Sequence, residues 1–121
     1  MKFIFNNNIP IYIQLVEQLK IHIISGNISC GERLPSVRDL ALKTKVNPNT
    51  MQKALVELED MKLIFTDRTN GKYVTEDKKL IDKYKKQYAD NLSYNYLSSM
   101  KNIGFDNDSI INYLKEKGGD K

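Results

Sequence analysis

Neutral hydrogen-bonding side chains crowd into the short segment NPNTMQK. Asn47 and Asn49 flank a proline, and Thr50, Gln52 and Lys53 follow at once. Asparagine and glutamine amides can form paired hydrogen bonds with adenine, and threonine can touch a thymine methyl group or a phosphate. This is the chemistry of a helix that reads base edges. The alternative is that the same side chains only cap and solvate a surface helix.

Positive charge comes from the flanks of this segment. From Ser36 to Lys53 four basic residues stand against Asp39 alone, and the whole chain has a net charge of +4. An anionic partner is therefore favoured. Arg38 is the candidate for a phosphate or base contact beside Ser36. Its alternative is a surface salt bridge with Asp39 or Glu32, which would contribute little.

The spacing of apolar residues predicts three helices around these side chains. Residues 10–25 place apolar side chains on one helical face. A second helix over 36–45 begins with a capping box, in which Ser36 accepts the amide of Asp39 and Asp39 reaches back. Asn47 as N-cap, followed by proline, starts a third helix that runs to about residue 61. The two or three residues that join the last two helices predict a helix-turn-helix.

A β-hairpin is predicted next. Residues 63–66 and 73–75 favour strands, and Asn70-Gly71 between them is a strong signal for a two-residue hairpin turn. Three helices followed by a hairpin is the element order of a winged helix. Asn70, Gly71 and Lys72 at the tip can enter or skirt a minor groove, or they can simply form a good turn.

The remaining chain is predicted to be helical, with a break at Gly104 and a last helix capped by Asp106. An apolar stripe that one small winged helix cannot cover suits a partner subunit. The alternative is that the tyrosines of the tail line a ligand pocket. The stripe predicted for dimerisation consists of Ile81, Tyr84, Tyr88, Leu92, Tyr96 and Met100.

These elements together predict a mainly α fold with a small β-hairpin, a winged helix-turn-helix with C-terminal dimerisation helices. We place the winged helix-turn-helix DNA-binding domain at residues 1–76 and the helical dimerisation region at 77–121.

Catalysis has no support in the sequence, and we expect no enzyme. His22 is the only histidine, within an apolar helix, and no phosphate-binding glycine loop or nucleophile elbow is present. Cys30 is the only cysteine, so an internal disulfide and a zinc cluster are excluded, and no cofactor or metal is expected. The chain has no apolar run that could cross a membrane and no signal-peptide pattern, which predicts a cytoplasmic protein without a membrane partner.

Two motifs together carry a family resemblance. The run "GERLPSVRDLA" and the run "NPNTMQKALVELE" resemble the N-terminal winged helix of GntR-family bacterial transcription regulators, over about residues 9 to 75. The short tail resembles that of the YtrA subfamily. This resemblance implies dimerisation through two C-terminal helices and regulation of operons for ABC-type transporters.

The resemblance also implies DNA contacts at particular positions. Many relatives carry serine-arginine in place of Asn47-Pro48 and arginine in place of Gln52. In the wing, Thr69 stands in place of a glycine, and Lys72 in place of a threonine. Residues and resemblance together give the predicted DNA-binding set, which is Ser36, Arg38, Asn47, Asn49, Thr50, Gln52, Lys53, Gly71 and Lys72.

The sequence therefore predicts a homodimeric regulator, a repressor, that binds a pseudo-palindromic operator in double-stranded DNA. Two alternatives stay open. One is a winged-helix adaptor that binds proteins without specific DNA, which the basic cluster disfavours. The other is a regulator that senses an unknown small-molecule effector in a pocket of tail tyrosines.

Overall fold

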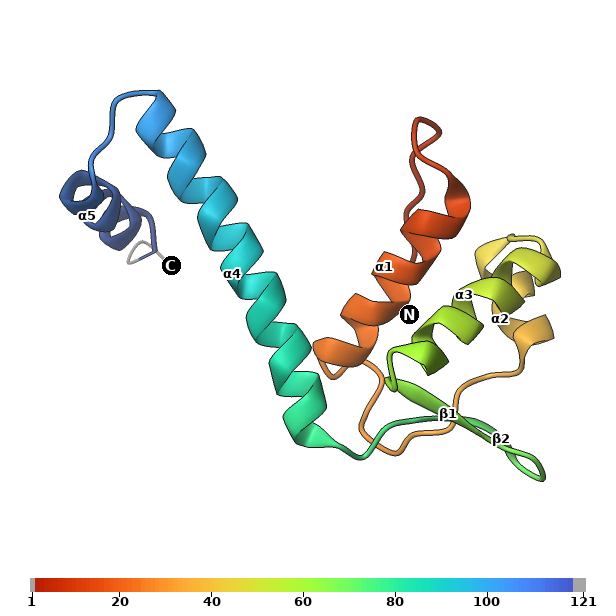
Figure 1. Ribbon diagram of the computed structural model, residues 1–121. Coiled ribbons are helices and arrows are strands. Elements are labelled where there is room, and N and C mark those ends of the chain that lie inside the picture. The colour runs from red at the N-terminus through yellow and green to blue at the C-terminus, as the bar shows by residue number, and fades with distance from the viewer. Residues whose placement is uncertain (1, 119–121) are drawn as a thin grey trace. The chain divides into compact units, whose positions relative to one another are not determined.

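The computed structural model describes residues 2–118. Within them the chain confirms the predicted fold class, a mainly α protein with one hairpin (Figure 1). The elements in chain order are α1 (Ile11–Ile24), α2 (Val37–Thr44), α3 (Pro48–Asp60), β1 (Ile64–Asp67), β2 (Gly71–Val74), α4 (Lys78–Asn102) and α5 (Asn107–Gly118).

The N-cap hydrogen bonds predicted for α2 and α3 are confirmed. The Ser36 hydroxyl accepts the amide of Asp39 at 3.0 Å, and the Asn47 side chain accepts the amide of Asn49 at 2.8 Å, with Pro48 as the first helical residue. The return half of the predicted capping box is not formed, because aspartate is one methylene shorter than the glutamate that this motif uses. Ser36 therefore caps α2 alone.

The tight turn of the helix-turn-helix depends on a lysine in a left-handed conformation. Lys45 has φ +58°, and the amide of Val46 bonds back to the carbonyl of Ala41 at 3.1 Å. This is the Schellman arrangement, in which glycine is the usual left-handed residue. Because Val46 is buried at the same point, the turn is pinned to the core and α3 starts in a defined direction.

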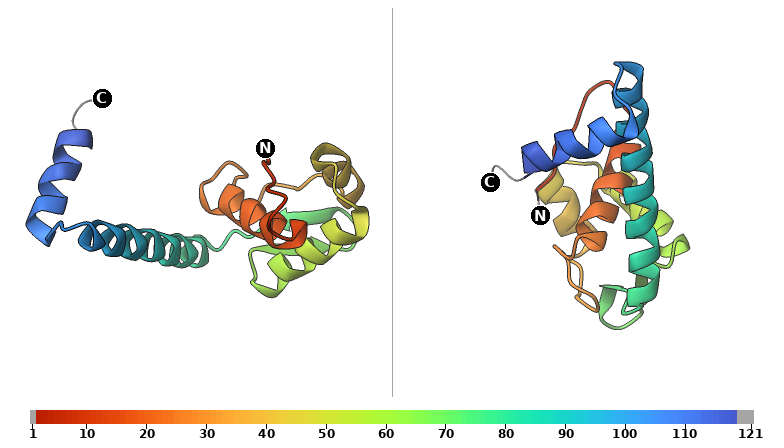
Figure 2. Two further views of the ribbon diagram at one scale, coloured as in Figure 1. Left: turned by 90° about the horizontal axis from the view of Figure 1, so that it is seen from above. Right: turned by 90° about the vertical axis from the view of Figure 1, so that its left-hand side faces the viewer.

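The hydrophobic core lies where α1 and α3 pack together, with α2 and the hairpin closing its sides. The two helices run next to each other in the further views of Figure 2. Met51, Ala54, Leu55 and Leu58 of α3 are fully buried. Each buried leucine stabilises the fold by about 1.5–3 kcal/mol relative to exposure. One face of α3 is thus committed to the core, and its other face is left to solvent.

Residues 2–9, here called the N-terminal strap, run along α1 over residues 2–6 and turn over residues 7–9. The Gln14 side chain bonds both backbone groups of Asn6, accepting its amide at 2.6 Å and donating to its carbonyl at 2.7 Å. Gln18 does the same for Ile4, at 2.9 and 2.5 Å. The two glutamine side chains thereby supply hydrogen-bond partners for backbone groups of the strap, which is not part of a sheet.

The single histidine forms the third contact between α1 and the N-terminal strap, after those of Gln14 and Gln18. His22 is buried, its Nε2 lies 2.9 Å from the carbonyl oxygen of Lys2, and its ring packs at 5.1 Å from that of Phe3. Two extended residues span about 6.6–6.8 Å and four helical residues about 6 Å, so every second strap residue meets every fourth helix residue. The role of His22 is therefore structural.

The hairpin, here called the wing, is confirmed, but its turn differs from the prediction. β1 and β2 pair antiparallel with Asp67 opposite Gly71, so three residues form the loop instead of the pair Asn70-Gly71. The Asp67 carboxylate accepts the amide of Thr69 at 2.9 Å and closes that loop. Gly71 then opens β2 at φ +105°, a conformation that glycine adopts without strain.

A further segment joins the wing on its other edge. The amide of Leu34 donates to the carbonyl of Lys72 at 2.8 Å, and the amide of Val74 donates to the carbonyl of Glu32 at 2.9 Å. Arg33 and Tyr73 form a β-bridge between these bonds. The sequence analysis assigned no helix or strand to this loop. The structure shows that this loop ties the wing to the start of α2.

The described chain divides into two compact units, and the boundary along the chain falls between Tyr84 and Lys85. The boundary that we placed after residue 76 stays a prediction. The first turns of α4 belong to the N-terminal unit because Ile81 is buried in its core and the Tyr84 hydroxyl donates to the carbonyl of Met61 at 3.3 Å. Residues 1 and 119–121, which the predicted domains include, lie outside the described residues.

The tail follows its predicted helix signals. Gly104, at φ +103°, ends α4, and the Asp106 carboxylate accepts the amide of Ser109 at 2.9 Å to start α5. Phe105 and Tyr113 meet edge to face at 5.6 Å between ring centroids. No helix within residues 2–118 has both the length and the apolar character needed to cross a membrane.

The strap should contribute to stability through Gln18. Replacing Gln18 with alanine removes two hydrogen bonds and should lower the free energy of unfolding by about 1–2 kcal/mol in urea denaturation. In a chain shortened to begin at residue 9, the same substitution should have almost no effect. An equal loss in both backgrounds would assign the effect to α1 itself.

Candidate nucleic-acid interface

The start of α3 presents its polar residues to solvent. Asn49, Gln52 and Lys53 are exposed, and Thr50 is half-buried beside them. Asn47 is also exposed, and its side-chain oxygen already accepts the capping bond, while its side-chain amide nitrogen can donate to a partner. The buried face of α3 holds this surface in place. The predicted reading residues therefore lie together, as neutral hydrogen-bonding groups on a rigid helix.

Arg38 lies on the exposed side of the first turn of α2. Among residues 2–118 it has no ion pair, so the predicted alternative of a salt bridge with Asp39 or Glu32 is not formed. Glu32 instead accepts the amide of Ser29 at 2.8 Å. The guanidinium of Arg38 is thus available to an outside anion.

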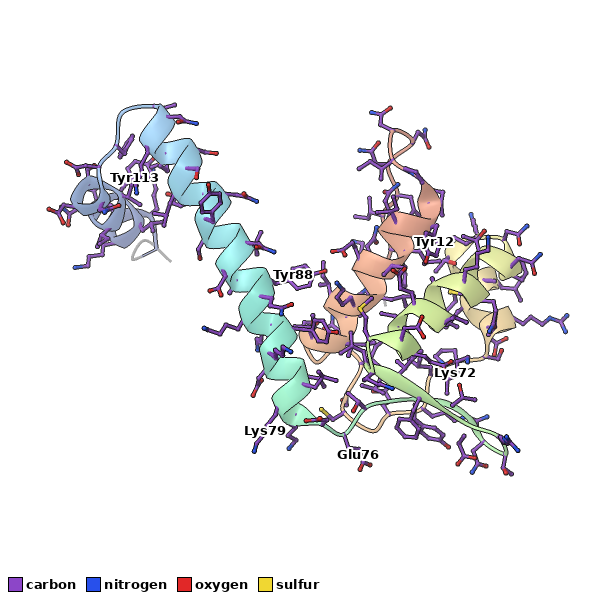
Figure 3. All side chains as sticks on the ribbon, viewed as in Figure 1. Tyr12, Lys72, Glu76, Lys79, Tyr88 and Tyr113 are labelled. Atoms are coloured by element: carbon purple, nitrogen blue, oxygen red, sulfur yellow. The ribbon has the colours of Figure 1, made fainter. Side chains whose placement is uncertain are left out.

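Lys72 is placed differently from the prediction. Its ammonium lies 2.6 Å from a carboxylate oxygen of Glu59 and 3.0 Å from the Thr66 hydroxyl, at the junction of the wing and α3 (Figure 3). The hydrogen bond from Lys72 is the main reason that the pKa of Glu59 is lowered. Lys72 therefore serves as a brace for the wing, since its charge is already balanced within the chain.

Tyr12 and Glu57 form a second brace, which the sequence did not reveal. The Tyr12 hydroxyl donates to a Glu57 carboxylate oxygen at 2.5 Å, which raises the tyrosine pKa and joins the start of α1 to α3 (Figure 3). The two residues stand 45 positions apart, so no local spacing marks them as a pair.

Sequence reasoning also missed two arginines near the wing. Arg33, in the segment bonded to β2, and Arg68, in the wing loop, are both exposed. Composition could have drawn attention to them, because only three of the nineteen basic residues are arginines. The third is Arg38.

The predicted dimerisation stripe divides along α4. Ile81 is buried and Tyr84 is bonded within the N-terminal unit, so both side chains have contacts in the single chain. Their part in dimerisation stays a prediction. Leu92 and Tyr96 are exposed, at 67% and 37%, while Tyr88 and Met100 are intermediate. For these four positions dimerisation stays a prediction.

Metal chemistry has no candidate among the described residues. No group of three or more histidine, cysteine, aspartate or glutamate side chains within residues 2–118 is arranged to hold a metal ion.

The fold and the exposed helix start define a winged helix-turn-helix protein. Residues 11–74 match the family model of the bacterial regulatory proteins of the gntR family. The chain belongs to this GntR family and is a transcriptional regulator, as its relatives are.

Three relatives show how far the similarity extends. The chain is 30% identical over 111 residues to the uncharacterized HTH-type transcriptional regulator YhcF of Bacillus subtilis, covering 92% of each chain. It is 44% identical over 70 residues to the HTH-type transcriptional repressor YtrA of the same organism, covering 58% of this chain and 54% of YtrA. A GntR family transcriptional regulator from Listeria monocytogenes superimposes with a TM-score of 0.85 at 40% identity, over 93% of this chain and 98% of that one. The YtrA-like assignment is thereby supported.

The Glu59–Lys72 pair predicts a pH dependence of stability. The folded pKa of Glu59 lies below its ordinary 4.5, so the pair stabilises the fold above that pH and its contribution is lost as the pH falls through the folded value. Glu59→Gln should therefore lower the urea midpoint at pH 7, and the difference from wild type should shrink at pH 3. Asp60→Asn, which removes a charge from the same turn without touching the wing, is the control. A difference that stays constant with pH would show that Lys72 is not the cause.

Proposed function

We propose that this chain represses transcription as a homodimer that binds a pseudo-palindromic operator in double-stranded DNA. The observation that carries the proposal is the start of α3, where Asn49, Gln52 and Lys53 are exposed while the opposite face of the helix is buried. A recognition helix needs this division, because its N-terminal residues enter the major groove and the helix must not rotate.

The neutral character of this surface suggests which bases it prefers. Asn49 and Gln52 can each bond an adenine edge through two hydrogen bonds, whereas guanine is most often read by arginine or lysine. No arginine lies on α3. We therefore infer an operator whose contacted positions are mainly A·T pairs, with Lys53 adding a phosphate contact.

Repression and the regulated genes rest on similarity. The relative YtrA is named a transcriptional repressor and matches over 70 residues. Control of a transporter operon comes only from the family resemblance of the short tail. Both belong to the proposal, and mapping of binding sites across the genome tests them directly.

Dimerisation is proposed for the second half of α4 together with α5. Leu92, Tyr94 and Ile103 are 67–71% exposed in the single chain. A soluble chain rarely leaves so many large apolar side chains uncovered unless another surface packs on them. Two copies would also match two half-sites about one turn of DNA apart, roughly 34 Å.

The two alternatives from the sequence remain distinguishable. An adaptor without specific DNA binding predicts no preference for any sequence in DNA selected from a random pool. A small-molecule effector among the tail tyrosines predicts a higher melting temperature in a ligand screen, because binding only to the folded state stabilises it.

Base reading can be tested at Gln52. In a binding selection on random DNA, wild type should enrich a pseudo-palindromic site. Gln52→Ala should relax the preference at one position in each half-site, by about 1–3 kcal/mol. The matched control is Lys53→Gln, which should weaken all sequences alike. If Gln52→Ala also weakens every sequence equally, direct reading by Gln52 is excluded.

Dimerisation can be tested at Leu92. Leu92→Glu places a charge on the exposed apolar surface of α4 and should shift the protein from dimer to monomer in sedimentation, with operator affinity falling as the second half-site is lost. Lys79→Glu, in the exposed first turn of α4 and outside the half of the helix proposed for dimerisation, should leave the dimer intact. A monomeric wild type would refute the proposed interface.

A further inference from the structure

A groove of about 270 Å³ opens between the start of α2 and the wing. One wall comes from the N-cap of α2 and the residues before it, and the other from the wing loop and the first residues of β2. The residues that matter for the argument are Arg33, Ser36, Asp67, Arg68 and Gly71. None of the groups that we assigned to base reading lies in it.

Two of the three arginines of the chain line this groove, and the third follows it closely in sequence. Arg33 and Arg68 line it, and Arg38 follows two residues after the lining residue Ser36. Elsewhere the chain uses lysine for positive charge. Lysine is a point charge, whereas the planar guanidinium forms two parallel hydrogen bonds to one phosphate. The concentration of arginine in one place therefore points to an oxyanion ligand.

Arg33 is held in position by the backbone. Its neighbours Glu32 and Leu34 bond β2 on both sides of the bridge to Tyr73. The guanidinium lies over Gly71, since a Cβ at that position would be in ordinary van der Waals contact with it, 3.4 Å from Arg33 Nε and 3.6 Å from a terminal nitrogen. Arg33 thus lies over the wing at Gly71. Glycine is favoured at that position because the backbone has φ +105°, which other residues rarely adopt.

The arginines of the groove are not paired with an acidic side chain within the described residues. Neither Arg33 nor Arg68 forms an ion pair among residues 2–118. The one carboxylate in the lining, Asp67, is occupied in the wing loop, where it accepts the amide of Thr69 at 2.9 Å and the side-chain amide of Asn70 at 3.4 Å. The neighbouring Lys72, by contrast, is already balanced by Glu59.

We propose that this groove holds one DNA backbone phosphate, bound between the guanidinium groups of Arg33 and Arg68. The proposal rests on the proposed function and deepens it. This phosphate would lie on one DNA strand of the operator, between the bases contacted by α3 and the DNA contacted by the wing. Such a contact sets the register of the protein on DNA and selects no base.

The first test is the salt dependence of binding, measured with the full chain and its selected operator by fluorescence anisotropy. A substitution removes the phosphate contact in both half-sites of the dimer, so it should reduce the slope of log affinity against log salt concentration by about 1.8, which is about 0.9 for each contact. We expect this reduction for Arg33→Gln and for Arg68→Gln. Arg33→Lys should keep the wild-type slope but bind more weakly, because the charge remains and the paired hydrogen bonds are lost.

The control is Lys79→Gln, an exposed lysine at the start of α4 that does not line the groove (Figure 3). It should leave the slope close to that of wild type. Melting temperatures of all variants show whether each one folds. A slope for Arg33→Gln equal to that of Lys79→Gln would overturn the phosphate site.

The second test locates the phosphate on the DNA. Operator duplexes are made in which one phosphate at a time is replaced by an uncharged methylphosphonate. One position should weaken wild type and have no additional effect on Arg33→Gln, because that variant has already lost the contact. If every position weakens both proteins by the same factor, the proposed site is wrong although the operator is real. If wild type shows no preferred DNA at all, the proposed function fails and the phosphate site fails with it.

Discussion

The packing of α3 against α1 is the constraint on which the rest of the structure depends. Met51, Leu55 and Leu58 are fully buried, so rotation of α3 would expose large apolar side chains to water. The capped start, with Asn47 and proline, adds a defined first turn. The exposed polar residues are therefore presented in one orientation, which is the physical requirement for a surface that distinguishes ligands by hydrogen bonds.

The wing is attached to this core by two kinds of bond. The backbone of residues 31–34 pairs with β2, and the ion pair of Lys72 with Glu59 joins the hairpin to the end of α3. Each link connects segments that are remote in sequence. A two-stranded hairpin alone is marginally stable in water, and these links supply the support that it needs. The start of α2, the wing and α3 consequently form one frame.

The structure differs from the sequence prediction at the wing turn, and it gives Lys72 and Ile81 contacts that the sequence did not predict. Asn70-Gly71 indicated a two-residue turn, but the Asp67 side chain accepts an amide inside the loop and favours three residues. Lys72 was placed at the hairpin tip as a candidate for DNA contact, and that contact stays a prediction. Lys72 meets Glu59 because cross-strand geometry places it beside α3. Ile81 belongs to the apolar stripe of α4, and its side chain packs into the hydrophobic core of the N-terminal unit.

The sequence by itself determined the element order, the caps at Ser36, Asn47 and Asp106, and the family, because these depend on local bonding and on spacing along one helix. Only the tertiary structure decided which charges are free and which are balanced. Lys72 is paired, whereas Arg33 and Arg68 come together across a groove from segments more than thirty residues apart. Electrostatic contacts of this kind depend on distance in space, and the separation of two residues in the chain does not reveal that distance.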